Sequence, residues 1–125
     1  MLRPGRVDFK GINELVVTFK TDDSLKVEDE GKLVKSVDTD IVGKCGDGDL
    51  FLGEMLKFEE RGTCSVRMEG YFELEYSGTA PTVGHGLLVS DKDGKVKAAT
   101  GEPATGVLAR IVRVNTDKKL VGFFI

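Results

Sequence analysis

Residues 70–86 read GYFELEYSGTAPTVGHG, and the alternation in this stretch decides the fold. Large apolar side chains at Phe72, Leu74 and Tyr76 are separated by Glu73 and Glu75, which predicts a strand with one buried face and one mostly charged face. A turn follows, because Ser-Gly-Thr-Ala-Pro cannot continue a sheet: glycine permits the turn and proline lacks a ladder donor. Leu-Leu-Val at 87–89 then restarts the sheet.

The same pattern of short strands and glycine-rich turns continues along the rest of the chain. No segment repeats apolar residues at helical spacing over a useful length, although a one-turn helix within residues 25–35 is compatible with the pattern. The sequence therefore predicts an all-β fold, a small β-sandwich or barrel. The other expected strands cover residues 12–20, 32–37, 41–42, 50–60, 63–68, 95–99, 105–115 and 120–125.

Two local features modify this pattern. Gly53 interrupts the strand at 50–60 and places Glu54 on the same side as Leu52 and Leu56, which predicts a β-bulge at Gly53. Residues 1–11 contain a proline, two glycines and two arginines, which predicts an extended N-terminal arm. Residues 12–125 are then expected to form a single β domain.

Composition excludes several classes of protein. The chain has 125 residues, of which 40% are hydrophobic and 31% charged, as expected for one globular domain. The formal net charge of −3 argues against a nucleic-acid partner, because phosphate-binding proteins normally carry a basic patch. No apolar run approaches the roughly 20 residues that span a bilayer, and the N-terminus lacks the apolar core of a signal peptide. We therefore expect no membrane partner and synthesis that ends in the cytoplasm.

The two cysteines do not form a motif. Cys45 and Cys64 are too far apart in sequence for a Cys-x-x-Cys pair, and no second pair completes a zinc site. Cys64 alternates with Val66 and Met68, which predicts a buried position. A disulfide between the two is not expected in a reducing cytoplasm, and the sequence leaves their pairing open.

No convincing catalytic or metal-binding set is present in the sequence. The segments 91–94 and 47–49 contain paired aspartates, but turns explain them better than calcium loops, which need a further acidic ligand. His85 stands between two glycines with no nucleophile in a suitable context. Glu73 and Glu75 point to the same side of one strand, as on any exposed strand face. We therefore expect a protein that is not an enzyme and that needs no cofactor or metal.

The segment 66–97 carries a resemblance to a known class of protein. Its strand, the Ser-Gly-Thr-Ala-Pro-Thr-Val-Gly turn, the short apolar strand and the Asp-x-x-Gly-Lys-Val-Lys turn resemble the capsid decoration, or head cement, proteins of tailed phages and prophages. The resemblance extends more loosely over residues 31–125. It implies a β-tulip-like fold and a homotrimer that binds the major capsid protein on the outside of the expanded shell. The implied location is the virion exterior, after synthesis in the host cytoplasm.

Two parts of the chain are candidates for contacts under this interpretation. The N-terminal arm is expected to order on the capsid because it combines apolar and basic side chains, namely Leu2, Arg3, Arg6, Val7 and Phe9. Phe9 could equally begin the first strand. The C-terminal residues Phe123, Phe124 and Ile125 are expected in a subunit interface or in the core, because an exposed apolar strand invites aggregation.

Two other functions remain open from the sequence. One is a different virion or tail component built on a similar β module. The other is a β-sandwich that binds a ligand such as a carbohydrate. The second alternative is disfavoured because such sites expose aromatic rings, and the chain has no Trp and only Tyr71 and Tyr76.

Overall fold

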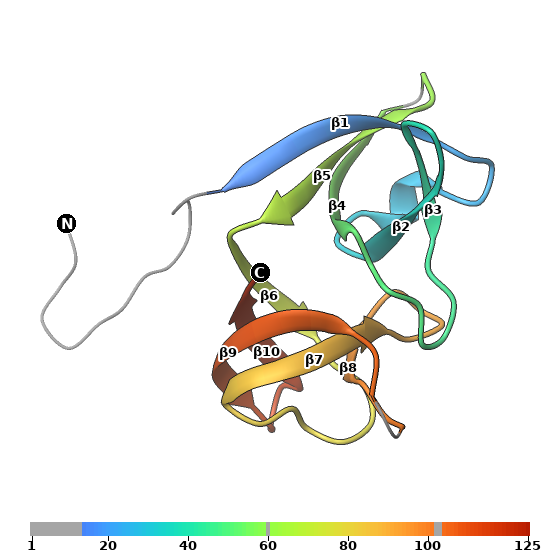
Figure 1. The fold of residues 1–125 in the computed structure, drawn as a ribbon. Coiled ribbons are helices and arrows are strands. Elements are labelled where there is room, and N and C mark those ends of the chain that lie inside the picture. Colours follow the sequence, from blue (N-terminus) through green and yellow to red (C-terminus); the bar gives the residue numbers. More distant parts are fainter. Residues whose placement is uncertain (1–13, 60, 102–103) are drawn as a thin grey trace, which may run out of the picture.

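The computed structural model describes residues 14–59, 61–101 and 104–125, and these residues form ten strands and one short 3-10 helix (Figure 1). The helix η1 spans Val27–Asp29, within the range in which the sequence allowed one turn. The strands are β1 (Leu15–Thr21), β2 (Leu33–Asp38), β3 (Ile41–Lys44), β4 (Gly53–Glu59), β5 (Thr63–Glu69), β6 (Tyr71–Glu75), β7 (Gly84–Ser90), β8 (Val96–Ala98), β9 (Val107–Asn115) and β10 (Leu120–Phe124).

Strands β1–β5 close into a barrel, here called the first barrel. Their order around it is β1-β3-β2-β4-β5, with β5 pairing back onto β1. The β1–β3 contact is parallel and the other neighbours are antiparallel. The β1–β3 contact involves only Lys20 and Thr21 of β1, so among the described strands residues 15–19 pair on one side only, with β5.

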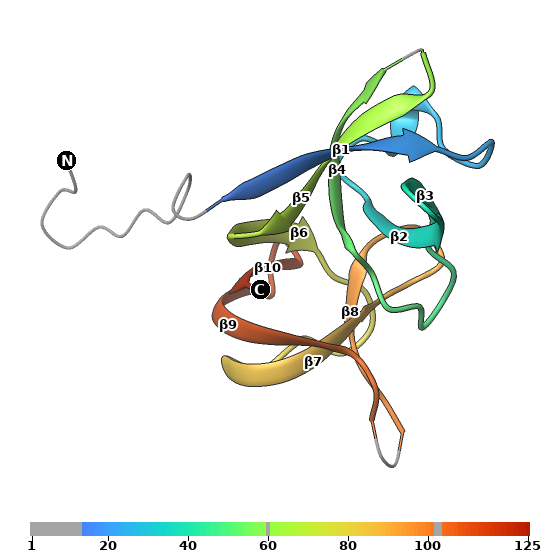
Figure 2. The same ribbon diagram turned by 45° about the horizontal axis from the view of Figure 1, so that its top comes forward.

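Strands β6–β10 form a second sheet in the order β6-β10-β9-β7-β8, here called the second barrel. Its two end strands approach each other, because Tyr76, just after β6, makes a parallel bridge to Val96 at the start of β8. The Ser77 N–H donates a hydrogen bond of 2.9 Å to the Val96 carbonyl at the same place. The sheet therefore curls into a nearly closed barrel beside the first one, as Figures 1 and 2 show.

The two barrels have the same connectivity. In each, the first and third strands in chain order meet in parallel, through Thr21 and Val42 in the first barrel and through Tyr76 and Val96 in the second. In each, the fourth and fifth strands form a hairpin, and the fifth returns to pair with the first. The chain therefore contains two copies of one five-stranded arrangement.

The position of a bulge supports this equivalence. On β4 the register shifts between Met55 and Lys57, which leaves Leu56 without a partner on β5. On β9 the register against β10 shifts so that Val112 is left over in the same way. The bulge lies at the same step of the same hairpin in both barrels, where it increases the local twist that a small barrel needs.

The cores of the two barrels are distinct clusters. In the first barrel, small aliphatic and sulfur side chains pack together: Leu25, Val34, Val42, Met55, Cys64 and Val66. In the second barrel, the rings of Phe72 and Phe123 stack 5.3 Å apart with an interplanar angle of 7°. This second cluster also contains Leu33, Cys45 and Phe51, which come from the first half of the chain. Phe51 meets Phe123 edge to face at 6.5 Å between ring centroids.

Backbone hydrogen bonds also join the two barrels. The Leu33 N–H donates to the Gly94 carbonyl (3.0 Å), the Gly48 N–H donates to the Ser90 carbonyl (2.8 Å), and the Ser90 N–H donates to the Asp49 carbonyl (3.0 Å). Only Gly70, with a φ of +113°, separates β5 from β6. Glycine suits this position because other residues rarely adopt such a dihedral. The barrels are thus fastened together by a short junction and a shared core.

The predicted all-β barrel or sandwich is confirmed, and each expected strand has a counterpart within the described residues. The predicted bulge at Gly53 is wrong, because the irregularity lies at Leu56. The structure explains Gly53 differently: a Cβ atom there would lie 2.0 Å from the Arg67 carbonyl oxygen. The expected N-terminal arm, residues 1–11, lies outside the described residues.

Candidate functional site

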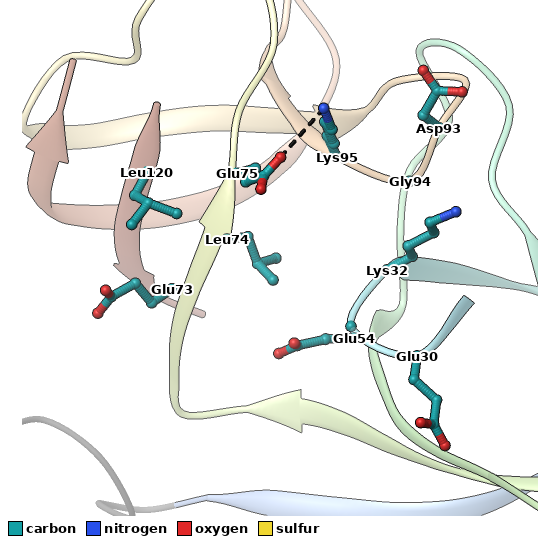
Figure 3. Close-up of a pocket in the computed structure, with 11 residues that line it drawn as sticks. Glu30, Lys32, Glu54, Glu73, Leu74, Glu75, Asp93, Gly94, Lys95 and Leu120 are labelled. Carbon is teal, nitrogen blue, oxygen red and sulfur yellow. Dashed lines mark ion pairs between the residues drawn. The ribbon is translucent and has the colours of Figure 1, made fainter. Parts of the chain in front are cut away.

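A groove of about 390 Å³ lies between the two barrels and is here called the inter-barrel groove (Figure 3). The first barrel contributes Glu30 and Lys32, from the connection between η1 and β2, and Glu54, from β4. The second barrel contributes residues from β6, from the turn before β8 and from the start of β10. Among the described residues, five carboxylates and two lysines line the groove. The carboxylates are those of Glu30, Glu54, Glu73, Glu75 and Asp93.

Strand β6 supplies one wall because of its alternation. Phe72 and Leu74 point into the second core, so Glu73 and Glu75 point outward. Glu75 pairs with Lys95 at 3.3 Å, which Figure 3 marks with a dashed line. The Tyr71 hydroxyl donates a hydrogen bond to Glu73 Oε2 at 3.1 Å. Burial and this hydrogen bond both raise the pKa of Tyr71.

Glu54 forms the opposite wall and is the most buried of the five carboxylates that line the groove. Its side chain is 13% exposed and accepts a hydrogen bond of 3.1 Å from Arg67 Nη1. Arg67 also donates from Nε to Glu14 at 2.5 Å, and its guanidinium lies 5.8 Å from the centre of the Phe72 ring. Burial raises the pKa of Glu54 to about 7, although the charge of Arg67 lowers it. Glu54 therefore titrates near neutral pH.

The floor of the groove is formed where the two barrels touch. Gly94 has a φ of +79°, and a Cβ atom there would lie 2.7 Å from the Lys32 Cβ. Glycine is required at this point by both the dihedral and the contact. Glu30 is held at the rim, where its Oε2 accepts the Phe58 N–H at 2.8 Å. The groove is thus built from strands and from the two connections before β2 and β8, with an excess of negative charge.

In each of the two turns with paired aspartates, an aspartate side chain accepts hydrogen bonds from backbone N–H groups. Asp91 Oδ1 accepts the N–H groups of Asp93 (2.8 Å) and Lys95 (2.9 Å), which confirms the turn interpretation of this segment. Asp49 Oδ2 accepts the Lys35 ammonium and the Gly46 N–H, each at 2.6 Å. These two bonds hold the pKa of Asp49 below its usual range. Within the described ranges, no group of three or more His, Cys, Asp or Glu side chains is arranged to hold a metal ion.

The C-terminal candidates lie in different environments. Phe123 is fully buried in the second core, and Ile125 packs against that core from a half-buried position. Phe124 is half-buried on the outer surface, 5.3 Å from the Tyr71 ring, with the Arg110 guanidinium 5.9 Å from its centre. The N-terminal candidates Leu2, Arg3, Arg6, Val7 and Phe9 lie outside the described residues.

Both cysteines are buried free thiols, and they belong to different clusters. The predicted burial of Cys64 is confirmed. Burial raises the pKa of both thiols, that of Cys45 to about 11, so neither is a ready nucleophile at neutral pH. His85 lies on the exposed part of β7.

Sequence reasoning did not find the inter-barrel groove. Its lining comes from separate segments that each contribute one to three residues, so no motif marks it. The one signal was the shared side of Glu73 and Glu75 on β6.

Comparisons with protein-family models, with curated proteins and with solved structures gave no match to this chain. In the part of the chain that the structure describes, no helix is long and apolar enough to cross a membrane.

Proposed function

We propose that this protein is a structural component of a tailed phage or prophage that binds the outer surface of the expanded capsid and stabilises it. The observation that carries the proposal is the pattern of residues 66–97, which resembles that of capsid decoration proteins. In the fold this segment runs from β5 through the turn to β8, and its strand β6 and the turn before β8 border the groove.

The architecture supports a binding role. Two barrels that share a core, backbone hydrogen bonds and a one-residue junction form a body that presents fixed surfaces. Such a body loses little conformational freedom when it bridges neighbouring subunits, so more of the contact energy appears as affinity. The groove offers charges at fixed positions for recognition.

Stabilisation of a shell follows from linkage. A protein that binds only the assembled and expanded arrangement stabilises that arrangement by about 2.7 kcal/mol per site when its free concentration is a hundredfold above the dissociation constant. The effect is repeated at every occupied site of the shell. A modest local interaction therefore becomes a large barrier to rupture.

The experiment is co-sedimentation of the purified protein with matched empty capsids in the expanded and unexpanded states. Pelleting with expanded shells alone is the expected result. A protein that lacks residues 1–10 should then pellet less, because the arm is the candidate capsid contact. Absence from the pellet with both kinds of shell would refute the decoration role, and detection in purified tails would favour the alternative virion component.

The carbohydrate-binding alternative gains no support from the aromatic residues on which it depended. Tyr71 and Tyr76 are 6% and 5% exposed, so neither ring forms an open stacking platform.

A further inference from the structure

The outer face of β7 and β9, here called the β7–β9 face, has the composition of a protein interface. His85 pairs with Arg110 across the two strands, and Leu87 pairs with Leu108 in the same direction. Leu108 is 63% exposed, and Val112 further along β9 is 38% exposed. Interface cores favour arginine and large apolar residues, whereas lysine and glutamate are depleted there.

The charge of this face is opposite to that of the whole molecule. The chain has 21 acidic residues and a net charge of −3, yet neither Gly84–Ser90 nor Val107–Asn115 contains an Asp or Glu. Arg110 is held in place over the Phe124 ring. Its guanidinium is therefore positioned before any partner arrives, which lowers the entropic cost of using it in a contact.

The inter-barrel groove lies on the other side of the second barrel. Around this barrel the strands follow the order β6-β10-β9-β7-β8, and Tyr76 and Val96 bring the ends together. In such a ring the β9–β7 pair is opposite β6, the strand that supplies Glu73 and Glu75 to the groove. Arg110 lies over Phe124 of the intervening strand β10 and does not line the groove of its own molecule.

We propose that the β7–β9 face of one copy packs against the inter-barrel groove of a second copy. The exposed Leu108 and Val112 are removed from water at this contact, and Arg110 meets the carboxylates of Glu73 and Glu75. Because the two surfaces differ and lie on opposite sides, the association is head to tail. Such heterologous contacts close into a ring or extend as a chain, and every copy uses both surfaces.

A nucleic acid fits these surfaces less well than a second copy. The β7–β9 face places aliphatic side chains between its basic groups, whereas phosphate tracking requires many cations. The acidic groove would repel a phosphate backbone, but it complements the face of another copy. The inference concerns contacts between copies of this chain and does not depend on the capsid proposal.

The test begins with sedimentation equilibrium of the purified full chain from about 10 μM to about 1 mM. The wild-type protein is expected to form species larger than a monomer at low ionic strength and to dissociate as salt screens the charges. A protein that remains monomeric over this whole range would overturn the proposal, whatever the capsid experiment shows.

Charge reversal then locates the contact. Arg110→Glu and Glu75→Lys are each expected to weaken self-association about tenfold or more, because each places like charges across the contact. An equimolar mixture of the two variants should associate again, since each supplies the charge that the other lacks. Lys20→Glu is the matched control, as Lys20 is exposed on β1, away from both surfaces, and should leave association unchanged.

Far-UV circular dichroism and thermal melting check that every variant is folded. Wild-type affinity in Arg110→Glu, an equal loss in Lys20→Glu, or a mixture that is as monomeric as its two components would each contradict the proposed contact.

Discussion

The two barrels share one connectivity and one bulge position, yet they differ in which part of the chain supplies the side chains of their cores. The first barrel fills its interior with side chains from its own half of the chain, mostly small aliphatic and sulfur-containing ones. The second stacks Phe72 on Phe123 and then takes Leu33, Cys45 and Phe51 from the first half. The same backbone arrangement therefore supports one self-contained core and one that depends on its neighbour.

The outer surfaces differ at equivalent positions too. On the first barrel, Glu54 and Arg67 are opposite each other on β4 and β5 and form an ion pair at the groove. On the second barrel, the same step of the hairpin places Arg110 opposite Phe124. The comparison indicates that this position serves the junction in one barrel and an open surface in the other. Four sets of substitutions test the comparison.

The largest effect is expected from Phe51→Ala. Phe51 belongs to the first half of the chain but is 5% exposed in the second core, so its removal should leave a cavity there and lower the free energy of unfolding by about 3–5 kcal/mol. Urea unfolding measures this loss. Phe58→Ala, at a half-buried position on the first core, should cost roughly half as much.

The Phe51 variant also tests whether the two cores unfold together. Both tyrosines lie in the second barrel, so tyrosine fluorescence reports that barrel, while labelling of Cys64 reports the first. Because the second core depends on Phe51 while the first core is filled from its own half of the chain, loss of the tyrosine signal is expected before Cys64 becomes reactive. Reaction of Cys64 before the tyrosine signal is lost would show that the first core depends on Phe51 as well.

The next largest effect is expected from Gly53→Ala, with Gly122→Ala as its counterpart on the second barrel. An added Cβ would lie 2.0 Å from the Arg67 carbonyl oxygen in the first case and 2.1 Å from the Tyr71 hydroxyl in the second. A backbone oxygen cannot move without disturbing the β4–β5 ladder, whereas the end of the Tyr71 side chain can shift. We expect losses of about 2–3 kcal/mol at Gly53 and about 1 kcal/mol at Gly122. Equal losses in thermal or urea unfolding would show that the two contacts are equally rigid.

An intermediate effect is expected in the pH dependence contributed by Glu54. The pKa of this carboxyl is about 7 in the folded protein and 4.5 without the fold, so the folded state binds more protons between these values. Stability should therefore fall as pH rises from about 4.5 to about 7, by at most about 3 kcal/mol. In Glu54→Gln this part of the slope should disappear. Urea midpoints measured from pH 5 to pH 8 give both curves, and parallel curves would exclude Glu54 as the cause.

The smallest effect is expected from Lys97→Ala, which removes an ion pair between the two halves. Lys97 Nζ lies 2.6 Å from Asp47 Oδ1, but the Asp47 side chain is 64% exposed. Exposed pairs contribute about 1 kcal/mol or less, so the free energy of unfolding should change little. A double-mutant cycle with Asp47→Asn isolates the pair, and a coupling above about 2 kcal/mol would show that it holds the barrels together.

Alternation was enough to predict the strands that have one buried face. Residues 63–68 and 70–76 show this most clearly, since every second side chain enters a core. The duplication of the fold was not predictable, because equivalent positions carry different residues. Val17 pairs with Val66 in the first barrel where Phe72 pairs with Phe123 in the second. A repeated backbone arrangement leaves no sequence signal when the two cores are filled differently.

Long-range contacts explain the other differences. The sequence marked Gly53 as unusual but gave no means of telling a bulge from a close approach to Arg67, which is remote in the chain. The inter-barrel groove is likewise created where the barrels meet, and its charges come from strands and turns that have local reasons for their sequences. Only Glu73 and Glu75 could be placed on a common surface beforehand, because they belong to one strand.

The dependence of the second core on Phe51 bears on the order in which the two barrels fold during synthesis. Synthesis proceeds from the N-terminus. The first barrel, including the residues Leu33, Cys45 and Phe51 that pack in the second core, is therefore complete before β6 leaves the ribosome. The later strands then assemble on an existing surface, and Phe72 and Phe123 find an aromatic partner already in place. If the second barrel were synthesised first, the rings of Phe72 and Phe123 would stay exposed until Phe51 was made. Limited proteolysis of ribosome-bound chains that have emerged as far as residue 70 should accordingly find the first barrel already protected.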